Sequence, residues 1–532
     1  MCGACGANAP TSLVTGYLGL RGIEPAFTRA LGEWLGPRGA LSRAGGHWVL
    51  REPTGGTRLF RTAEELAGRV HTLAASRHGS PRAEGVAEAI RGLAALRSRP
   101  LAELATLRPG WDGRTLADWL IGEAGSSSSR GVIGLPPEPR LRHPGGMTIE
   151  RVQADSLEQL RERTSSKWRT FDADVLPLPV AEMDVPIPPV IKDVLRDAIE
   201  RNDIGYPRGT EEIGAAFNAF ARERWGWDAP VSTLVPTTDV GVGIVELLRR
   251  IIAPGDGVIV TTPVYPPFWT LPVEAGATLV PVPLAGGIAE GWSLDLDAIE
   301  RAFAAGARAI LLCHPHNPVG RVHRPEELAA LAEIADRYDA TVISDEIHAP
   351  LTFAEAEFTP FLAVSDTARR VGVAITSASK AWNLAGLKFA FMLSASPEGD
   401  ALLASLPEAV GTRVSILGLK AQVAAFRDGG PWLDGVLALL DSNRALLAEL
   451  LAEHLPLASY RIPEASYLAW VDLSAYGLGD DPAARFLADA RVAFGSGVTF
   501  EPTAGAGHVR INFGTSPEIL TEAIERVARV VS

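Results

Sequence analysis

The stretches ATVISDEIH (340–348) and TSASKAWNLAGLK (376–388) decide the fold of this chain. The first is a short apolar run that ends in a polar loop, and similar runs upstream alternate with longer amphipathic stretches. This alternation predicts an α/β fold with a mostly parallel sheet. Ligands of such sheets bind beyond the carboxyl ends of the strands, where Tyr265, Asn317 and Asp345 occur in the sequence. We therefore expect these three residues at one site.

Length and composition indicate a globular chain of several domains. The 532 residues are 47% hydrophobic and 21% charged, and no apolar run approaches the roughly 18 residues that a membrane-spanning helix needs. Three cysteines cannot make a disulfide framework, and the opening MCGACGANAP lacks the basic and apolar regions of a secretory signal. We therefore predict a cytoplasmic protein without a membrane contact.

A linker rich in Gly, Ser and Pro at 126–147 divides the chain. Before it, we predict a small mixed α+β accessory domain at 1–125, with two strands around a Thr-Gly-Gly turn in 47–61. After it, we predict an N-terminal arm and a large domain at 148–430 and a smaller α+β domain at 431–532. The expected helices are 62–75, 83–97, 114–121, 434–454 and 516–530, and the expected strands of the last domain are 460–473 and 508–513.

The accessory domain has two alternative roles. Residues 1–130 carry 16 Arg and 11 acidic residues, although the whole chain has a net charge of -13. This basic balance and a faint helix-turn-helix pattern at 115–132 raise DNA binding as one alternative. Cys2 and Cys5 form a C-x-x-C pair, which is half of a zinc site. The basic residues form no dense stripe, so we predict no nucleic-acid partner. The C-x-x-C pair is only half of a zinc site, so we predict no metal site either.

Eight segments in order give the chain a resemblance to a known family. The sequence from about 148 to 532 resembles the fold-type I enzymes that use pyridoxal 5'-phosphate (PLP), within the class I/II aminotransferase superfamily. Inside that superfamily it resembles the cystathionine β-lyase-like carbon-sulfur lyase group. The segments are LPLPVAEMDVPIPPV (176–190), IGYPRG (204–209), TPVYPPFW (262–269), CHPHNPVGR (313–321), SDEIHAPL (344–351), SASKAWNLAGLK (377–388), EASYLAWVDL (464–473) and HVRINFG (508–514).

The resemblance makes Lys380 the catalytic residue. The chain has only five lysines, and of these only Lys380 stands in an S-x-x-K setting. Its amine can bond to the cofactor aldehyde and then serve as the base that moves the substrate Cα proton. Asp345, at the mouth of an apolar strand, is suited to keep the pyridine nitrogen protonated.

Further roles follow from the same resemblance. Asn317 would donate a hydrogen bond to the cofactor ring hydroxyl, and Tyr265 would stack on the ring. Tyr206 would reach the cofactor phosphate of a partner subunit, which implies a homodimer, and Arg510 would hold the substrate α-carboxylate. Ser377 and Lys388 would contact the cofactor phosphate, through a hydroxyl and a point charge respectively. The remaining cofactor contacts implied are His348 and Val240, and the remaining substrate contacts are Asn383 and Trp382.

One departure from the family concerns the phosphate end of the site. The loop PTTDVGVGI (236–244) lies where the family has a Gly-Val-Val turn that cradles the phosphate. An acid beside a phosphate is unfavourable, so Asp239 puts in doubt either its own side-chain direction or the usual cradle.

We predict a PLP-dependent β-lyase that acts on cystathionine or another S-substituted cysteine and yields a thiol, pyruvate and ammonia. One alternative is an aminotransferase, which uses the same residues but returns the proton to the cofactor. A second alternative is a PLP-binding regulator whose output comes from the N-terminal domain.

Overall fold

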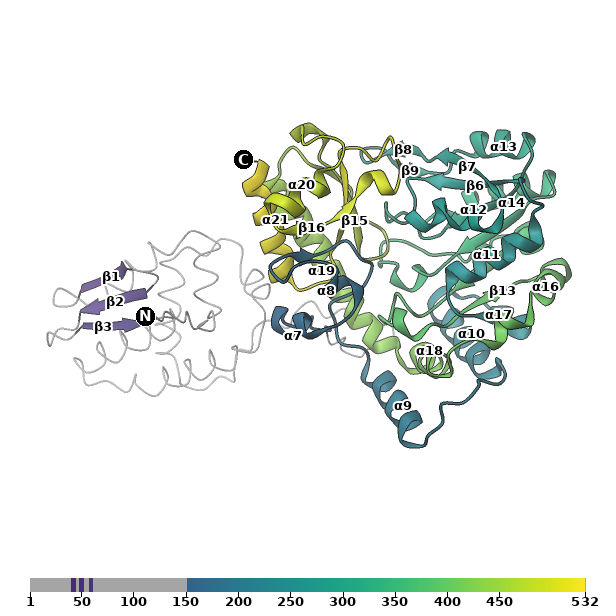
Figure 1. Cartoon of the computed structure of the whole chain (residues 1–532), viewed down its shortest axis with the longest axis horizontal. Helices are drawn as coiled ribbons and strands as arrows, with labels where there is room; N and C mark the ends of the chain where they lie inside the picture. The colour runs from purple at the N-terminus through teal and green to yellow at the C-terminus, as the bar shows by residue number, and fades with distance from the viewer. Residues whose placement is uncertain (1–39, 45–46, 52–56, 61–150, 532) are drawn as a thin grey trace, which may run out of the picture. The chain divides into compact units, whose positions relative to one another are not determined.

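The computed structural model describes residues 40–44, 47–51, 57–60 and 151–531 (Figure 1). The chain divides into two compact units, Met1–Pro139 and Arg140–Ser532. The described part of the first unit is an antiparallel sheet in the order β1-β2-β3. The two strands predicted within 47–61 are confirmed as β2 (His47–Arg51) and β3 (Thr57–Phe60), while β1 (Ala40–Ala44) was not predicted. The expected helices at 62–75, 83–97 and 114–121, the 115–132 pattern, the 126–147 linker, Cys2 and Cys5 lie outside the described residues.

A seven-stranded sheet in the order β5-β13-β12-β11-β10-β6-β7 forms the centre of the second unit. Its strands are parallel except β13, which runs antiparallel to both of its neighbours. The prediction of a mostly parallel sheet is therefore confirmed. The strands are β5 (Val235–Thr237), β6 (Gly257–Thr262), β7 (Thr278–Pro283), β10 (Ala307–Cys313), β11 (Thr341–Asp345), β12 (Gly372–Thr376) and β13 (Ala390–Leu393).

Helices cover both faces of this sheet because its strands are apolar on both sides. Along β10, Ile310 and Leu312 belong to one apolar cluster and Ala309 and Leu311 to another. The first cluster includes residues of α10, α13, α14 and α18, and the second includes residues of α11. The helices of this layer are α9 (Pro189–Glu200), α10 (Glu211–Trp225), α11 (Val240–Ile251), α12 (Leu271–Ala275), α13 (Leu296–Ala304), α14 (Pro325–Arg337), α15 (Asp366–Val371), α16 (Pro397–Ala404), α17 (Glu408–Thr412) and α18 (Ile416–Asp428).

A smaller antiparallel sheet, in the order β14-β15-β18-β17, follows the long helix α19 (Gly430–His454). The helices and strands predicted for the C-terminal region are present, but the first strand is split. Residues 461–467 form no strand, and β15 begins only at Leu468. The elements are β14 (Ser459–Tyr460), β15 (Leu468–Asp472), α20 (Pro482–Asp489), β16 (Val492–Ala493), β17 (Gly495–Ser496), β18 (His508–Asn512) and α21 (Pro517–Val531).

The N-terminal arm of the second unit packs on this smaller sheet. It contains α7 (Leu157–Glu162), α8 (Ser166–Arg169) and β4 (Leu176–Pro177). β4 pairs in parallel with β16, so residues more than 300 positions apart lie side by side. A hairpin of β8 (Ala285–Gly287) and β9 (Gly291–Ser293) completes the fold. Among the described residues, no helix has both the length and the apolar character needed to cross a membrane.

Candidate active site

The candidate site lies at the carboxyl ends of four neighbouring strands. Parallel pairing sets Cys313 of β10 opposite Asp345 of β11, and Asp345 opposite Ile375 of β12. The loops after β6, β10 and β12 carry Tyr265, Asn317 and Lys380, so these side chains meet Asp345 at one edge of the sheet.

Lys380 lies in the tight turn that follows β12, and its side chain is half-buried. Its Nζ donates a hydrogen bond to the Ala181 carbonyl at 3.1 Å. Burial and the positive charge of Arg510 lower the pKa of the Lys380 amine to about 8, although Asp345 acts in the opposite direction. A substantial fraction of this amine is therefore uncharged and nucleophilic near neutral pH.

Asp345 is the last residue of β11 and is 6% exposed. Its Oδ1 accepts a hydrogen bond from the Ile347 N–H at 3.1 Å. Burial raises the pKa of the Asp345 carboxyl to about 7, while that backbone donor and Lys380 partly offset the effect. Among the described residues no cation lies within ion-pair distance of Asp345, so a bound cationic group would stabilise its ionised form.

Arg510 of β18 reaches the same site from the smaller sheet and is 6% exposed. Its guanidinium donates to Asn317 Oδ1 at 3.1 Å and to the Pro179 carbonyl at 2.5 Å. The Nε of Arg510 is buried without a hydrogen-bond partner among the described residues. Burial lowers the pKa of the guanidinium to about 10. Arg510 is thus a buried cation with spare donor capacity, which suits a carboxylate ligand.

Tyr265 and His348 lie at the same site as Lys380, Asp345 and Arg510. Burial raises the pKa of the Tyr265 phenol, and the nearby Asp345 carboxylate adds to this effect. His348 is 3% exposed, and its Nδ1 lies 3.1 Å from Ser466 Oγ. Burial, together with the charges of Lys380 and Arg510, lowers the pKa of His348 to about 3, so its ring is neutral.

The predicted phosphate contacts are not equally open to a ligand. Ser377 is 1% exposed, and its hydroxyl donates to the Phe389 carbonyl at 2.8 Å and accepts from Gln422 Nε2 at 2.8 Å. These bonds tie Ser377 to Phe389, just before β13, and to α18. Lys388 is exposed, and Val240 is the first residue of α11. Asp239 caps α11 and pairs with Lys388, which accounts for the direction of its side chain.

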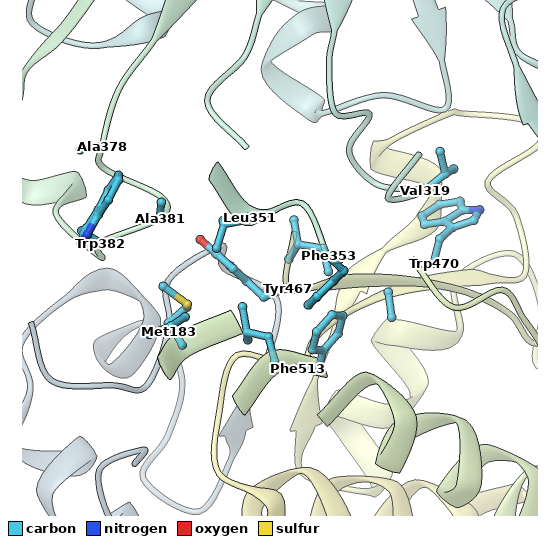
Figure 2. Packing of buried hydrophobic residues seen from close by; sticks show 14 of the residues in the cluster. Met183, Val319, Leu351, Phe353, Ala378, Ala381, Trp382, Tyr467, Trp470 and Phe513 are labelled. Atoms are coloured by element: carbon cyan, nitrogen blue, oxygen red, sulfur yellow. The ribbon is translucent and has the colours of Figure 1, made fainter. Parts of the chain in front are cut away.

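The predicted substrate contacts Asn383 and Trp382 are held by the protein itself. Asn383 Nδ2 donates to the Met183 carbonyl at 2.8 Å, and its Oδ1 accepts from the Met183 N–H at 3.0 Å. Trp382 is fully buried, and its indole donates to the Gly429 carbonyl at 3.0 Å. Figure 2 shows Trp382 beside Ala378 and Ala381, apart from Tyr467. In this structure Asn383 fixes the backbone of Met183, and Trp382 is part of the aromatic core.

A set of positioning contacts escaped the sequence analysis. The carbonyls of the 179–183 segment accept hydrogen bonds from side chains of other elements. Tyr467 and Lys380 both donate to the Ala181 carbonyl, and Asn512 donates to the carbonyls on either side of it. The motif AEMD lies in this segment, but a side chain that binds a backbone carbonyl leaves no signal in a single sequence. Tyr206 is 95% exposed, and it forms no hydrogen bond with any other residue in the described part of the chain.

Comparison with known proteins gives one family match. The model of the class I and II aminotransferases matches residues 173–527. A candidate cystathionine beta-lyase of Mycobacterium tuberculosis is 49% identical over 401 residues, which are 70% of this chain and 96% of that protein. A cystathionine beta-lyase of Corynebacterium glutamicum is 35% identical over 375 residues, covering 70% and 99%. The crystal structure of a candidate PLP-dependent beta-cystathionase from Corynebacterium diphtheriae matches with a TM-score of 0.68 at 37% identity, covering 71% and 99%.

The lowered pKa of Lys380 predicts an unusual pH dependence of its reactivity. The amine loses its proton as the pH rises, so its reaction with a small aldehyde should reach half its maximal rate near pH 8. An unperturbed lysine would reach half of its maximal rate at about pH 10.4. Borohydride trapping followed by peptide mass mapping between pH 6 and 10 measures this rate, with Lys420 as the internal reference. Labelling of Lys380 that rises only in step with Lys420 would contradict the prediction.

The Asn512 side chain should contribute strongly to stability. It is fully buried and donates to the Val180 and Glu182 carbonyls at 2.6 and 2.8 Å. Asn512→Ala removes one of two donors from each carbonyl, since the Glu182 N–H also donates to Val180 and Lys167 Nζ to Glu182. It also leaves the Gly514 N–H without its acceptor Asn512 Oδ1, so we expect a loss of roughly 1 to 3 kcal/mol in the free energy of unfolding. Ser442→Ala, on the exposed side of α19, is the control and should change stability by less than about 0.5 kcal/mol. Equal denaturant midpoints for the two variants would refute this role.

Proposed function

The chain belongs to the class I and II aminotransferase family, and on that premise we propose that it is a PLP-dependent carbon-sulfur β-lyase. Its substrates are cystathionine or other S-substituted cysteines. The observation that carries the proposal is that Lys380 and Asp345 meet at the carboxyl ends of β12 and β11. Lys380 has an amine with a pKa of about 8, and Asp345 is a buried carboxylate without an ion-pair partner among the described residues. The relatives named as cystathionine beta-lyases, at 35 to 49% identity, support the same reaction class.

The residues present fit PLP. Lys380 offers a partly uncharged amine to the cofactor aldehyde, and Asp345 offers a negative charge to the ring nitrogen. Asn317 keeps its Nδ2 as a donor for the ring hydroxyl because its Oδ1 already accepts from Arg510. Tyr265 supplies an aromatic face. When bound, PLP withdraws electrons from the substrate Cα and so makes the Cα–H bond acidic.

Each protein group then has one task. Arg510 binds the substrate α-carboxylate with the donors that face the site. The amine of Lys380, once free, takes the proton from Cα. Asp345 would hold the ring nitrogen of the cofactor through its negative charge and keep that nitrogen protonated. The Cα–H and Cβ–S bonds break, sulfur leaves as the thiolate, and addition of one water yields pyruvate and ammonia.

We further propose a homodimer. Of the large apolar side chains that are strongly exposed in the described part of the chain, several lie on the segment 199–206 or at the start of α11 and α12. They are Ile199, Ile204, Tyr206, Val242 and Val273. Residues 201–206 are exposed without interruption. An apolar surface of this kind supports contact with a second copy, in which Tyr206 would complete the partner's phosphate site. The cytoplasmic location, the domain boundaries and the role of residues 1–125 stay predictions.

Pyruvate release tests the reaction class. The purified protein should form pyruvate from cystathionine and from S-substituted cysteines without any added 2-oxo acid. Asp345→Asn should keep PLP bound but lower kcat/KM by about 100-fold or more, because a neutral amide stabilises the ring charge less. Asp366→Asn, at an exposed ion pair, is the matched control and should be fully active. Turnover that requires a 2-oxo acid and releases no pyruvate would instead identify a transaminase.

Subunit mixing tests the role of Tyr206. Tyr206→Ala and Lys380→Ala should each be inactive or nearly so. In a mixed dimer, one site combines the intact Lys380 of one subunit with the intact Tyr206 of the other. Co-refolding equal amounts should therefore restore about one quarter of wild-type pyruvate formation, since about half of the dimers are mixed and each has one complete site. A mixture no more active than the sum of its parents would rule out a shared site.

A further inference from the structure

Asp239 is the capping residue at the N-terminus of α11. Its Oδ1 accepts a hydrogen bond from the Val242 N–H at 2.9 Å, and its Oδ2 lies 3.2 Å from Lys388 Nζ. α11 has 12 residues, so its first turn presents free N–H groups and partial positive charge. One carboxylate thus engages a helix N-terminus and a lysine together, which are the two kinds of group that bind phosphate in proteins.

The N-terminus of α11 lies at the end of the site where the cofactor phosphate is predicted to bind. Lys388 is a predicted phosphate contact, and Val240, which follows Asp239, is a predicted cofactor contact in the loop where the family has its phosphate-cradling turn. Electrostatics also link Asp239 to Tyr265: burial and Asp345 raise the pKa of this phenol most, and Asp239 adds to the effect. Lys388 has a left-handed backbone with φ 52°, which is unfavourable for a residue with a Cβ, so the fold holds this lysine in a defined place.

We propose that Asp239 is an anion that engages the predicted phosphate-binding groups of the chain, the N-terminus of α11 and Lys388, and competes there with the phosphate of PLP. This inference rests on the proposed function. Phosphate must displace the carboxylate from Lys388 or bind beside it, and both cost affinity because like charges repel. The chain should therefore bind PLP reversibly and respond to its concentration.

The variant Asp239→Ser tests the effect of the negative charge separately from that of the helix cap. Serine caps a helix N-terminus about as well as aspartate, so α11 should keep its cap while the negative charge is lost. The Asp239–Lys388 pair is exposed, so its loss should leave the thermal stability of the apo-protein nearly unchanged. Asp481→Ser is the matched control, because Asp481 caps α20 through the Ala484 N–H at 3.3 Å and lies outside the site.

The measurement compares PLP with pyridoxal, which has the same ring and aldehyde but no phosphate. Absorbance titration of the apo-protein gives the Kd of each. We expect Asp239→Ser to lower the Kd for PLP about tenfold and to leave the Kd for pyridoxal unchanged. Lys388→Gln should raise the Kd for PLP alone, and Asp481→Ser should change neither.

Two results would overturn the inference. An unchanged Kd for PLP in Asp239→Ser would show that the carboxylate does not compete with the phosphate. A raised Kd would show that Asp239 instead holds Lys388 in place for the phosphate. Both leave the proposed function intact, because the wild-type chain still binds PLP. A wild-type chain that binds neither PLP nor pyridoxal would refute the proposed function itself.

Discussion

Five consecutive backbone carbonyls, from Pro179 to Met183, accept hydrogen bonds from side chains of other elements, and the candidate site depends on these bonds. The segment belongs to no strand of the described sheets, and of its five carbonyls Val180 also accepts from the Glu182 N–H, so side chains supply most of its donors. Alternate residues of β18 supply two of the donors, because Arg510 and Asn512 lie on one face of the strand. The first residues of the arm add another, since Lys167 donates to the Glu182 carbonyl and pairs with the buried Asp184. The segment thus joins the arm, the smaller sheet and the Lys380 turn.

Burial of charge prepares this site for its ligands. Two cations, Lys380 and Arg510, and one anion, Asp345, lie close together, and burial shifts the pKa of each toward its neutral form. Burying these three charges costs free energy, and ligand groups of opposite charge would offset that cost. A carboxylate ligand stabilises Arg510, and a cationic ring nitrogen stabilises Asp345. The site therefore selects a ligand set that carries both signs of charge.

The sequence predicted which residues meet at the site, because the order of parallel strands determines that. It did not predict where individual side chains point, because tertiary packing determines those directions. Asp345 and Lys380 could be placed together because the carboxyl ends of parallel strands share one edge. The direction of Ser377 could not be predicted, because its partner Gln422 lies 45 residues away on α18. Asn383 has a left-handed backbone with φ 61°, which turns its amide toward Met183, and no local pattern signals that conformation. The apolar surroundings of Trp382 were visible in the sequence, but not that its indole would be sealed in the core by Gly429.

The parallel pairing of β4 with β16 has a consequence for how the protein is made. The arm is synthesised first, but its partners come last: β4 pairs with Val492 and Ala493, and Arg491 binds Asp172 and Asp174. Until the ribosome has released these residues, the arm lacks its partners around β16, although it can already contact α19, and the 179–183 segment has no donors from β18. The large sheet can form earlier, from contacts that are closer in sequence. A nascent chain would thus carry Lys380 in a folded core while its site stayed incomplete, and catalytic competence would arrive only with the final strand and helix.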